Sequence, residues 1–293
     1  MRTQLVAVAT LMAGASTWAQ AYDRDLEQKV AADASGAVEI SNVAGSLDIT
    51  GWDRAEVEVR GTVGDGVDKV EVSGGGSRTY VKVITRRNTS DGEAHLQINV
   101  PKGSEVTATA VSADIASKRV TGRQRLTTVS GGIQAEIAGA DSQVKSVSGD
   151  IHLQGSRQPA DVRLSTVSGD LRLERAAGDV DATSVSGDVS VEVSPAKSVR
   201  LHSTAGDLTF TGQLAQNGSL DAETVSGEVK LAAGGGYEYE ALTFSGEIES
   251  CFGKQPERTS PHGPGSRLNG RLGEGGGRVR VKAMSGDINL CDK

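Results

Sequence analysis

One short motif recurs along this chain and constrains its fold more than any other feature. The tripeptide Ser-Gly-Asp, or a close variant, returns about every 19 residues, each time followed by an apolar residue. Counting degenerate copies, its central positions are 113, 131, 149, 169, 187, 206, 227, 246 and 286, so the steps are 18, 18, 20, 18, 19, 21, 19 and 40 residues. A fixed period of this length predicts a stack of like units rather than a conventional globular core.

Within one unit, the alternation of residues is that of two short β-strands. In the unit that spans residues 147–167, apolar residues alternate with polar ones on both sides of a turn at residues 155–159. Such period-2 patterning is typical of strands that bury one face. We expect the apolar positions to point inward and to form columns up the stack, as with Val147, Ile151, Leu153 and Leu164.

Two strands per unit are too few for a propeller blade, which has four strands in about 40 residues. No segment combines a helix cap with a sustained helical period. The sequence therefore predicts an all-β protein, a single-stranded parallel β-solenoid that is β-helix-like and has coils of about 19 residues, with successive coils about 4.8 Å apart. General handedness preferences predict right-handed winding.

The chain divides into three parts. Residues 1–21 have the features of a signal peptide: Arg2, an apolar run of about ten residues that is too short to span a bilayer, and the cleavage site Ala19-Gln20-Ala21. Residues 22–105 are strand-rich without the strict period and are expected to form an N-terminal cap and the first irregular coils. Residues 106–293 are expected to form the regular solenoid, with a looped excursion at 253–277, where Gly, Pro and charged residues concentrate.

The two cysteines occupy the same place in their repeat units. Cys251 lies four residues after Glu247, and Cys291 lies four residues after Asp287. In adjacent coils their Cα atoms would be about 5 Å apart, within the range for a disulfide, whereas one intervening coil would prevent the bond. Since an exported protein meets oxidising conditions, we expect a disulfide and a segment 253–277 that bulges out of the stack.

The motif itself is best interpreted as the corner of each coil. Glycine would make the turn, and the expected structural turns are at Gly149, Gly169, Gly187, Gly206, Gly227, Gly246 and Gly286. The companion serine hydroxyls are expected to bond to the turn backbone, since no strand-to-helix nucleophile elbow is present. The column of acids could hold hard cations, but solvated turn acids explain it better because the denser pattern of calcium-binding β-rolls is missing.

The sequence offers no catalytic constellation, no cofactor motif and no metal-ligand spacing. The four histidines, His95, His152, His202 and His262, follow no ligand pattern. The formal net charge is −7, and it becomes −8 once Arg2 is removed with the signal peptide (30 − 38). Since lysine and arginine are dispersed among acids, nucleic acid is not expected as a partner. No later stretch reaches transmembrane length.

Several segments together resemble a known family. These are residues 40–52 (ISNVAGSLDITGW), residues 96–103 (LQINVPKG) and the recurrent Val-Ser-Gly-Asp units. In combination they are similar to the DUF4097 family of bacterial exported proteins, often labelled adhesins, and the resemblance covers most of residues 37–293. It implies a β-helix-like solenoid and a location in the cell envelope. It supplies no catalytic residues, and some relatives are associated with envelope-stress signalling.

These observations favour a non-enzymatic scaffold or interaction protein of the bacterial envelope, exported to the periplasm or the cell surface. Its expected partner is an envelope protein or a glycan. One alternative is a polysaccharide-binding or polysaccharide-cleaving β-helix, which would need a groove built from few aromatic residues, such as Trp52, Tyr237 or Tyr239. Another is an envelope-stress sensor that binds a peptide or a regulator.

Overall fold

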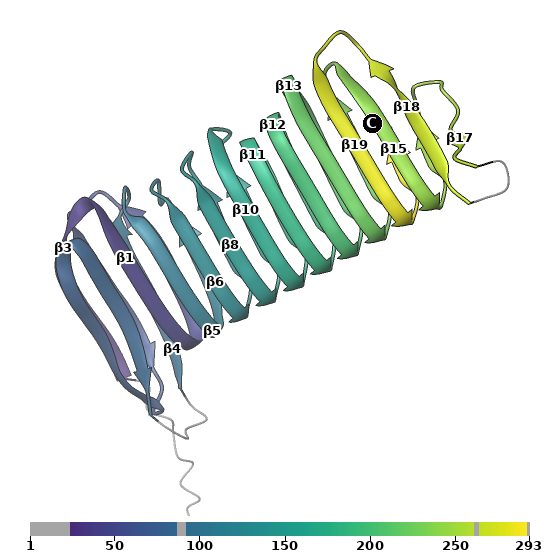
Figure 1. Ribbon diagram of the computed structural model, residues 1–293. Coiled ribbons are helices and arrows are strands. Elements are labelled where there is room, and N and C mark those ends of the chain that lie inside the picture. The colour runs from purple at the N-terminus through teal and green to yellow at the C-terminus, as the bar shows by residue number, and fades with distance from the viewer. Residues whose placement is uncertain (1–23, 87–91, 261–263, 292–293) are drawn as a thin grey trace, which may run out of the picture.

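The computed structural model describes residues 24–86, 92–260 and 264–291. The predicted signal peptide, residues 1–21, lies outside the described residues, as do residues 261–263 of the predicted excursion. All the assigned elements are β-strands, and they form an elongated stack (Figure 1). The described residues contain no helix that is long and apolar enough to cross a membrane.

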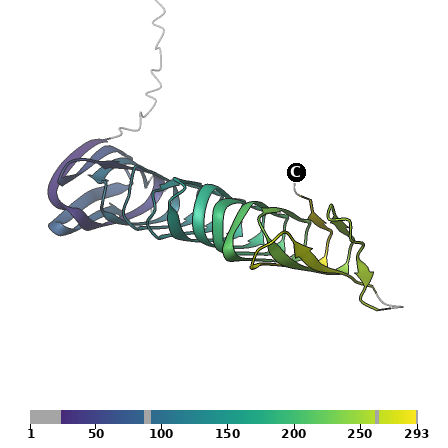
Figure 2. The ribbon, with the colours of Figure 1, turned by 90° about the horizontal axis from the view of Figure 1, so that it is seen from above.

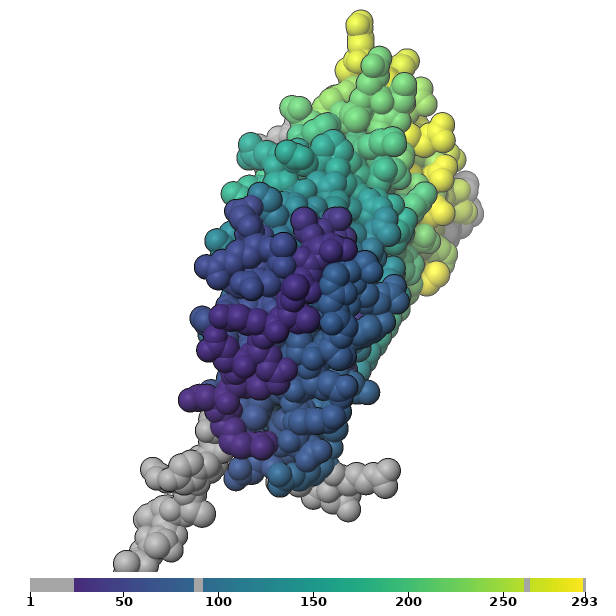
Figure 3. All heavy atoms as spheres, turned by 90° about the vertical axis from the view of Figure 1, so that its left-hand side faces the viewer, coloured from purple at the N-terminus to yellow at the C-terminus, as the bar shows by residue number. Residues whose placement is uncertain are grey.

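The N-terminal end differs from the rest of the stack because some of its strands run antiparallel. Its strands are β1 (Arg24–Trp52), β2 (Glu56–Val63), β3 (Val67–Thr85), β4 (Glu93–Pro101) and β5 (Glu105–Lys118). The first part of β1 pairs antiparallel with β2, which also pairs antiparallel with β4, whereas β1 pairs parallel with β3, β4 and β5. Seen end-on, residues of these first strands cover this end of the molecule (Figure 3).

The repeat region is a regular parallel stack. Its strands are β6 (Gln124–Ser130), β7 (Ile133–Ile137), β8 (Ser142–Ser148), β9 (Ile151–Gly155), β10 (Pro159–Ser168), β11 (Leu171–Ser186), β12 (Val189–Ala205) and β13 (Leu208–Ser226). Each coil pairs in parallel with the next, and like positions stack: Ile151 pairs with Leu171, and Leu171 pairs with Val189. The architecture is therefore all-β and β-solenoid-like. The right-handed winding stays a prediction.

Each coil has two walls that meet at the Ser-Gly-Asp corner, and the view from above shows a flattened rod (Figure 2). The front wall, which faces the viewer in Figure 1, consists of strand segments that end at the corner, such as β8, β10 and the second half of β11. The rear wall consists of segments that begin after the corner, such as β9 and the first half of β11. Residues of both walls fill the core between them.

The alternation predicts most of the core correctly and is wrong at one position. Ile151, Leu153 and Leu164 are buried, whereas Val147 is 47% exposed and Ser146 points inward in its place. The expected alternation runs unbroken from the front wall through the corner into the rear wall. In the structure the turn at Ser148 and Gly149 interrupts it, so both residues before the glycine face the solvent.

The coils at the C-terminal end stack in a different order from the sequence. This end contains β14 (Val229–Gly234), β15 (Tyr237–Ser245), β16 (Ile248–Ser250), β17 (Glu257–Arg258), β18 (Ser266–Leu272), β19 (Gly277–Ser285) and β20 (Ile288–Leu290). Strand β19 lies between β13 and β15 and pairs in parallel with both, and β20 lies likewise between β14 and β16. The last coil, β19 and β20, is thus inserted between the two coils that precede it in sequence, that of β13 and β14 and that of β15 and β16.

The intervening segment explains how this insertion is possible. Strand β18 pairs antiparallel with the outer edge of β15, and β17 pairs antiparallel with β18 (Figure 1). These strands therefore extend the stack past β15 instead of bulging out of it, and the chain then returns to β19 on the other side of β15. The two cysteine-bearing coils are then neighbours. The predicted disulfide joins Cys251 and Cys291, with their Cα atoms 5.1 Å apart.

Candidate interaction surface

The glycine of each corner allows successive coils to approach closely. At Gly187, φ is 133°, and an added Cβ would lie 2.2 Å from the carbonyl oxygen of Gly169 in the preceding coil. Both the backbone conformation and the contact therefore require glycine. Positive φ occurs at all seven expected turns, Gly149, Gly169, Gly187, Gly206, Gly227, Gly246 and Gly286.

The acids of the corner hold neighbouring coils together. The Oδ1 atom of Asp170 accepts the main-chain N–H of Asp188 at 2.9 Å, and the Oδ1 atom of Asp188 accepts that of Asp207 at 2.8 Å. A charged acceptor on a main-chain donor makes a comparatively strong hydrogen bond. The expectation of a purely solvated acid misses this role. Within the described residues, no group of three or more His, Cys, Asp or Glu side chains could hold a metal ion.

The serine column does not make the expected bonds to the turn backbone. Ser148, Ser168 and Ser186 are exposed, and among the residues that the structure describes no hydrogen bond of their hydroxyls is present. The hydroxyls that point into the core belong instead to the residues two positions earlier, in the front wall. Four of these in consecutive coils have no hydrogen-bond partner in the structure: Ser146, Thr166, Ser184 and Ser203.

Between these two columns runs a row of exposed apolar residues. It occupies the same register position in successive coils, in the order Val43, Val111, Val129, Val147, Val167, Val185, Thr204, Val225, Met284 and Phe244. Apart from Thr204, these side chains are between 38% and 60% exposed. We call this row the apolar column. Contiguous apolar surface along the length of a protein is uncommon and usually marks an interaction site.

A hollow of about 500 Å³ lies on the front wall near the C-terminal end, between β15, β18 and β19. Its lining alternates in sign from strand to strand, because glutamates on β15 lie between arginines on β18 and β19. Glu240 pairs with Arg267 at 2.6 Å and with Arg280 at 3.8 Å. Such cross-strand pairs stabilise neighbouring strands, and the two glutamates would oppose an anionic ligand. We therefore assign this hollow a structural role.

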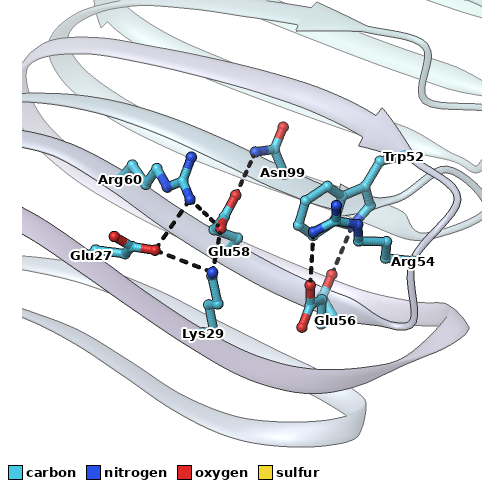
Figure 4. Close-up of polar contacts among 8 residues, drawn as sticks. All are labelled: Glu27, Lys29, Trp52, Arg54, Glu56, Glu58, Arg60 and Asn99. Atoms are coloured by element: carbon cyan, nitrogen blue, oxygen red, sulfur yellow. Dashed lines mark hydrogen bonds and ion pairs between the residues drawn. The ribbon is translucent and has the colours of Figure 1, made fainter.

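The other notable polar cluster lies at the N-terminal end (Figure 4). The buried carboxylate of Glu58 contacts Lys29 at 2.9 Å and Arg60 at 3.0 Å, and it accepts a hydrogen bond from Asn99 at 3.0 Å. The hydrogen bond from Lys29 is the main cause that lowers the pKa of Glu58 below its ordinary value. Because these residues come from β1, β2 and β4, the cluster ties the antiparallel strands of this end together.

The three aromatic residues expected in a glycan groove do not form one. Tyr237 and Tyr239 are buried, and the Tyr239 ring packs against Phe252 with the ring centroids 5.2 Å apart. Trp52 is half-buried at the opposite end; its indole N–H donates to the main-chain oxygen of Glu56, and the Arg54 guanidinium lies 4.8 Å from its ring centroid. These residues stabilise the two ends of the stack.

The three histidines that the structure describes, His95, His152 and His202, lie on different strands, β4, β9 and β12. His95 contacts Ser46 at 3.1 Å, and His152 lies 3.9 Å from Glu174. His202 is exposed on β12, and His262 lies outside the described residues. Sequence reasoning missed the apolar column because it assigned Val147 to the core. The recurrence of an apolar residue, mostly valine, before the Ser-Gly-Asp motifs was the available signal.

Comparisons with solved structures give likenesses at low sequence identity. The chain is similar to a candidate adhesin from Bacteroides fragilis, with 12% identity, a TM-score of 0.48, and coverage of 92% of this chain and 97% of that chain. It is also similar to a candidate cell adhesion protein from Clostridium sporogenes, with 9% identity, a TM-score of 0.30, and coverage of 92% and 99%. It is similar as well to a candidate lipid-binding protein from Parabacteroides distasonis, with 14% identity, a TM-score of 0.32, and coverage of 92% of this chain and 96% of that chain.

Comparison with curated proteins gives no significant match. The sequence profile of the Toastrack family, DUF4097, matches residues 22–199 and 68–291, which together span most of the chain. This match agrees with the family expected from the segment at residues 40–52 and from the repeated corner motif. The chain belongs to the Toastrack DUF4097 family.

Proposed function

We propose that this chain is an exported, non-enzymatic interaction protein of the bacterial cell envelope, which binds its partner through the apolar column of the front wall. The observation that supports this proposal is the exposure of the apolar column to solvent. Exposure of a valine side chain to water is not favourable in free energy, and polar residues at the same position could form an outer strand face equally well. A binding role accounts for its presence in almost every coil of the stack.

The other columns of the corner support this function over catalysis. The aspartates that could act as acids or bases bridge the backbone of neighbouring coils, as Asp150 does with Asp170 at 2.9 Å. The exposed serines Ser148, Ser168 and Ser186 make no hydroxyl hydrogen bond to a base among the described residues. A rigid wall with an apolar row suits recognition of a partner, either an envelope protein or a glycan.

Export is supported by two observations from opposite ends of the chain. Residues 1–21 have the features of a signal peptide. The bond between Cys251 and Cys291 suits an oxidising compartment such as the periplasm or the cell surface. In this proposal residues 22–105 cap the stack and contribute Val43 to the apolar column, residues 106–293 provide the rest of the binding wall, and β17 and β18 cover the far end.

Binding of the purified chain to fractionated envelope tests this proposal. Replacing Val167 and Val185 by lysine should abolish retention on the envelope fraction, because the two charges break the middle of the apolar column. The matched control replaces Gln134 and Ser190, which are exposed on the rear wall, by lysine and should bind like the wild type. Equal binding by both double variants would contradict the proposal.

Turnover assays on envelope polysaccharides provide a separate check on the non-enzymatic part. No release of reducing sugar is expected from the wild-type chain. Release that persists in repeated preparations would show that the chain cleaves polysaccharide and is not only a binding protein.

A further inference from the structure

The spacing of the apolar column restricts what can bind along its whole length. Successive members are one coil apart, about 4.8 Å. Side chains on one face of an extended peptide repeat about every 6.6 Å, so their spacing no longer matches that of the apolar column after a few residues. Turns of an α-helix repeat every 5.4 Å, so over nine steps a helix falls out of register with the apolar column by about one coil. A second stack of coils keeps the same step throughout.

The front wall is also large enough for such a partner. Ten members of the column span nine steps, or about 43 Å. A standard interface covers about 800 Å² on each partner, which at this length needs a strip of about six residues along each strand at 3.3 Å per residue. Front-wall strands such as β10 and β15, with 10 and 9 residues, provide that width.

The symmetry of a pair fixes which residues would meet. In a twofold dimer the same surface of both subunits forms the interface. We consider a twofold axis that lies in the interface and runs parallel to the strands. Each row of residues on one copy then faces the same row on the other copy, and the coils of the two copies run in opposite order. With full overlap, Val167 of one copy faces Val185 of the other, and Val43 faces Phe244.

Charges on the front wall favour this arrangement. In the row four residues before the apolar column, reversal places Arg163 opposite Asp181 and Arg125 opposite Asp221, each twice in the dimer. Within the described residues Asp181 has no ion pair, and Arg125 bonds to Gln143 at 3.1 Å. Their counterparts are held by their own chain, Arg163 by Asp161 at 2.7 Å and Asp221 by Arg280 at 3.9 Å, so the cross-interface pairs would share these charges. Opposed charges of this kind select partner and register.

Only one opposed pair in this row carries like charges. Glu39 faces Glu240 at the two ends of the interface. Each is already paired within its own chain, Glu39 with Arg78 at 3.7 Å and Glu240 with Arg267 at 2.6 Å. Their repulsion across the interface is therefore reduced.

We infer that the partner of the front wall is a second copy of this chain, packed with its coils in reverse order so that the two apolar columns interlock. This inference rests on the proposed function, because it names the occupant of the same surface. The dimer would bury the apolar column, while the acidic corners and both rear walls would stay open to solvent and to other envelope components.

Sedimentation equilibrium of the exported chain tests the inference. The expected mass is twice that of one chain. Substitution of both Val167 and Val185 by lysine should raise the dissociation constant at least about tenfold, since lysine then faces lysine at the centre. The control variant, with lysine at Gln134 and Ser190, should remain dimeric. Circular dichroism of each variant establishes that it is folded.

A charge exchange tests the register of the two copies. Asp181→Arg alone should weaken the dimer, because it places two arginines opposite each other. Adding Arg163→Asp restores opposite signs and should recover most of the lost affinity. A failure of the second substitution to rescue the first would overturn the reversed, full-length register.

The outcomes also separate this inference from the proposed function. A wild-type chain that is monomeric at every soluble concentration, yet loses envelope binding when Val167 and Val185 become lysine, would overturn the second copy as partner and leave the proposed function standing. A monomer whose envelope binding does not respond to these changes would overturn both.

Discussion

The main-chain N–H of Asp170 donates to the Oδ1 atom of Asp150 in the preceding coil, at 2.9 Å. The same bond links Asp170 to Asp188 and Asp188 to Asp207, so each aspartate serves as acceptor for the next coil. The corner is thereby held by side chains in addition to the parallel strands on either side. Aspartate suits this position because its short side chain reaches the neighbouring backbone without leaving the solvent.

Replacing Asp170 by alanine should destabilise the fold by about 1–2 kcal/mol, because the N–H of Asp188 loses its charged acceptor. Asp170→Asn keeps an oxygen at the same place and should cost less than half as much. Glu223→Ala, at an exposed front-wall residue, is the control. Urea unfolding measures the differences. Equal losses for the alanine and asparagine variants at Asp170 would show that the Oδ1 bond does not stabilise the stack.

The adjacent glycines Gly131 and Gly132 should respond oppositely to alanine. Gly131 has φ of 144°, and a Cβ there would lie 2.4 Å from the carbonyl oxygen of Ala113, so Gly131→Ala should cost about 2–4 kcal/mol. At Gly132 the nearest atom to a Cβ is 3.7 Å away. Gly132→Ala should be neutral or stabilise by up to about 1 kcal/mol. Thermal unfolding of the two variants compares them directly, and similar melting temperatures would contradict the corner geometry.

Aspartate at position 132 should stabilise the protein further. Gly132 occupies the place that aspartate holds in the following coils, and its N–H already donates to Asp114 Oδ1 at 2.8 Å. Gly132→Asp would supply the missing acceptor for the N–H of Asp150 and reduce the freedom of the unfolded chain, giving about 1–2 kcal/mol. The comparison with Gly132→Ala isolates the hydrogen bond. An aspartate variant no more stable than the alanine variant would disprove it.

The Glu58 cluster predicts a loss of stability in acid. Lys29 and the other partners lower the pKa of Glu58 in the folded state below its ordinary value of 4.5. Its stabilising contribution is therefore complete above pH 4.5 and is lost as the pH falls through the folded-state value. Glu58→Gln should be less stable than the wild type at neutral pH, and the difference should shrink below pH 4.5. A difference in urea midpoint that is constant down to about pH 3 would contradict this assignment.

The repeat and its period predict the parallel stack well because both arise from local patterning. Alternation assigns Ile151 and Leu153 to the core, and matched offsets pair Cys251 with Cys291. The order of the last coils does not follow from such signals. A gap of 40 residues lets the final coil stack on either side of its predecessor, and the cysteines are neighbours in both cases.

The binding surface is harder to predict for a related reason. Alternation assumes that a strand continues, whereas the corner glycine interrupts it between Val147 and Ile151. The interruption reverses which of Ser146 and Val147 faces the core. A short polar side chain is thereby buried and an apolar one exposed, opposite to what hydrophobicity alone predicts.

In living cells the apolar column of the front wall should be covered by a partner in the envelope. Photo-crosslinking in living cells measures this most directly, with a photoreactive residue in place of Val167 and, as the control, in place of Arg172 on the rear wall. We expect a strong adduct from position 167, with the mass of two chains, and little from position 172. No adduct from position 167, or equal adducts from both positions, would contradict it.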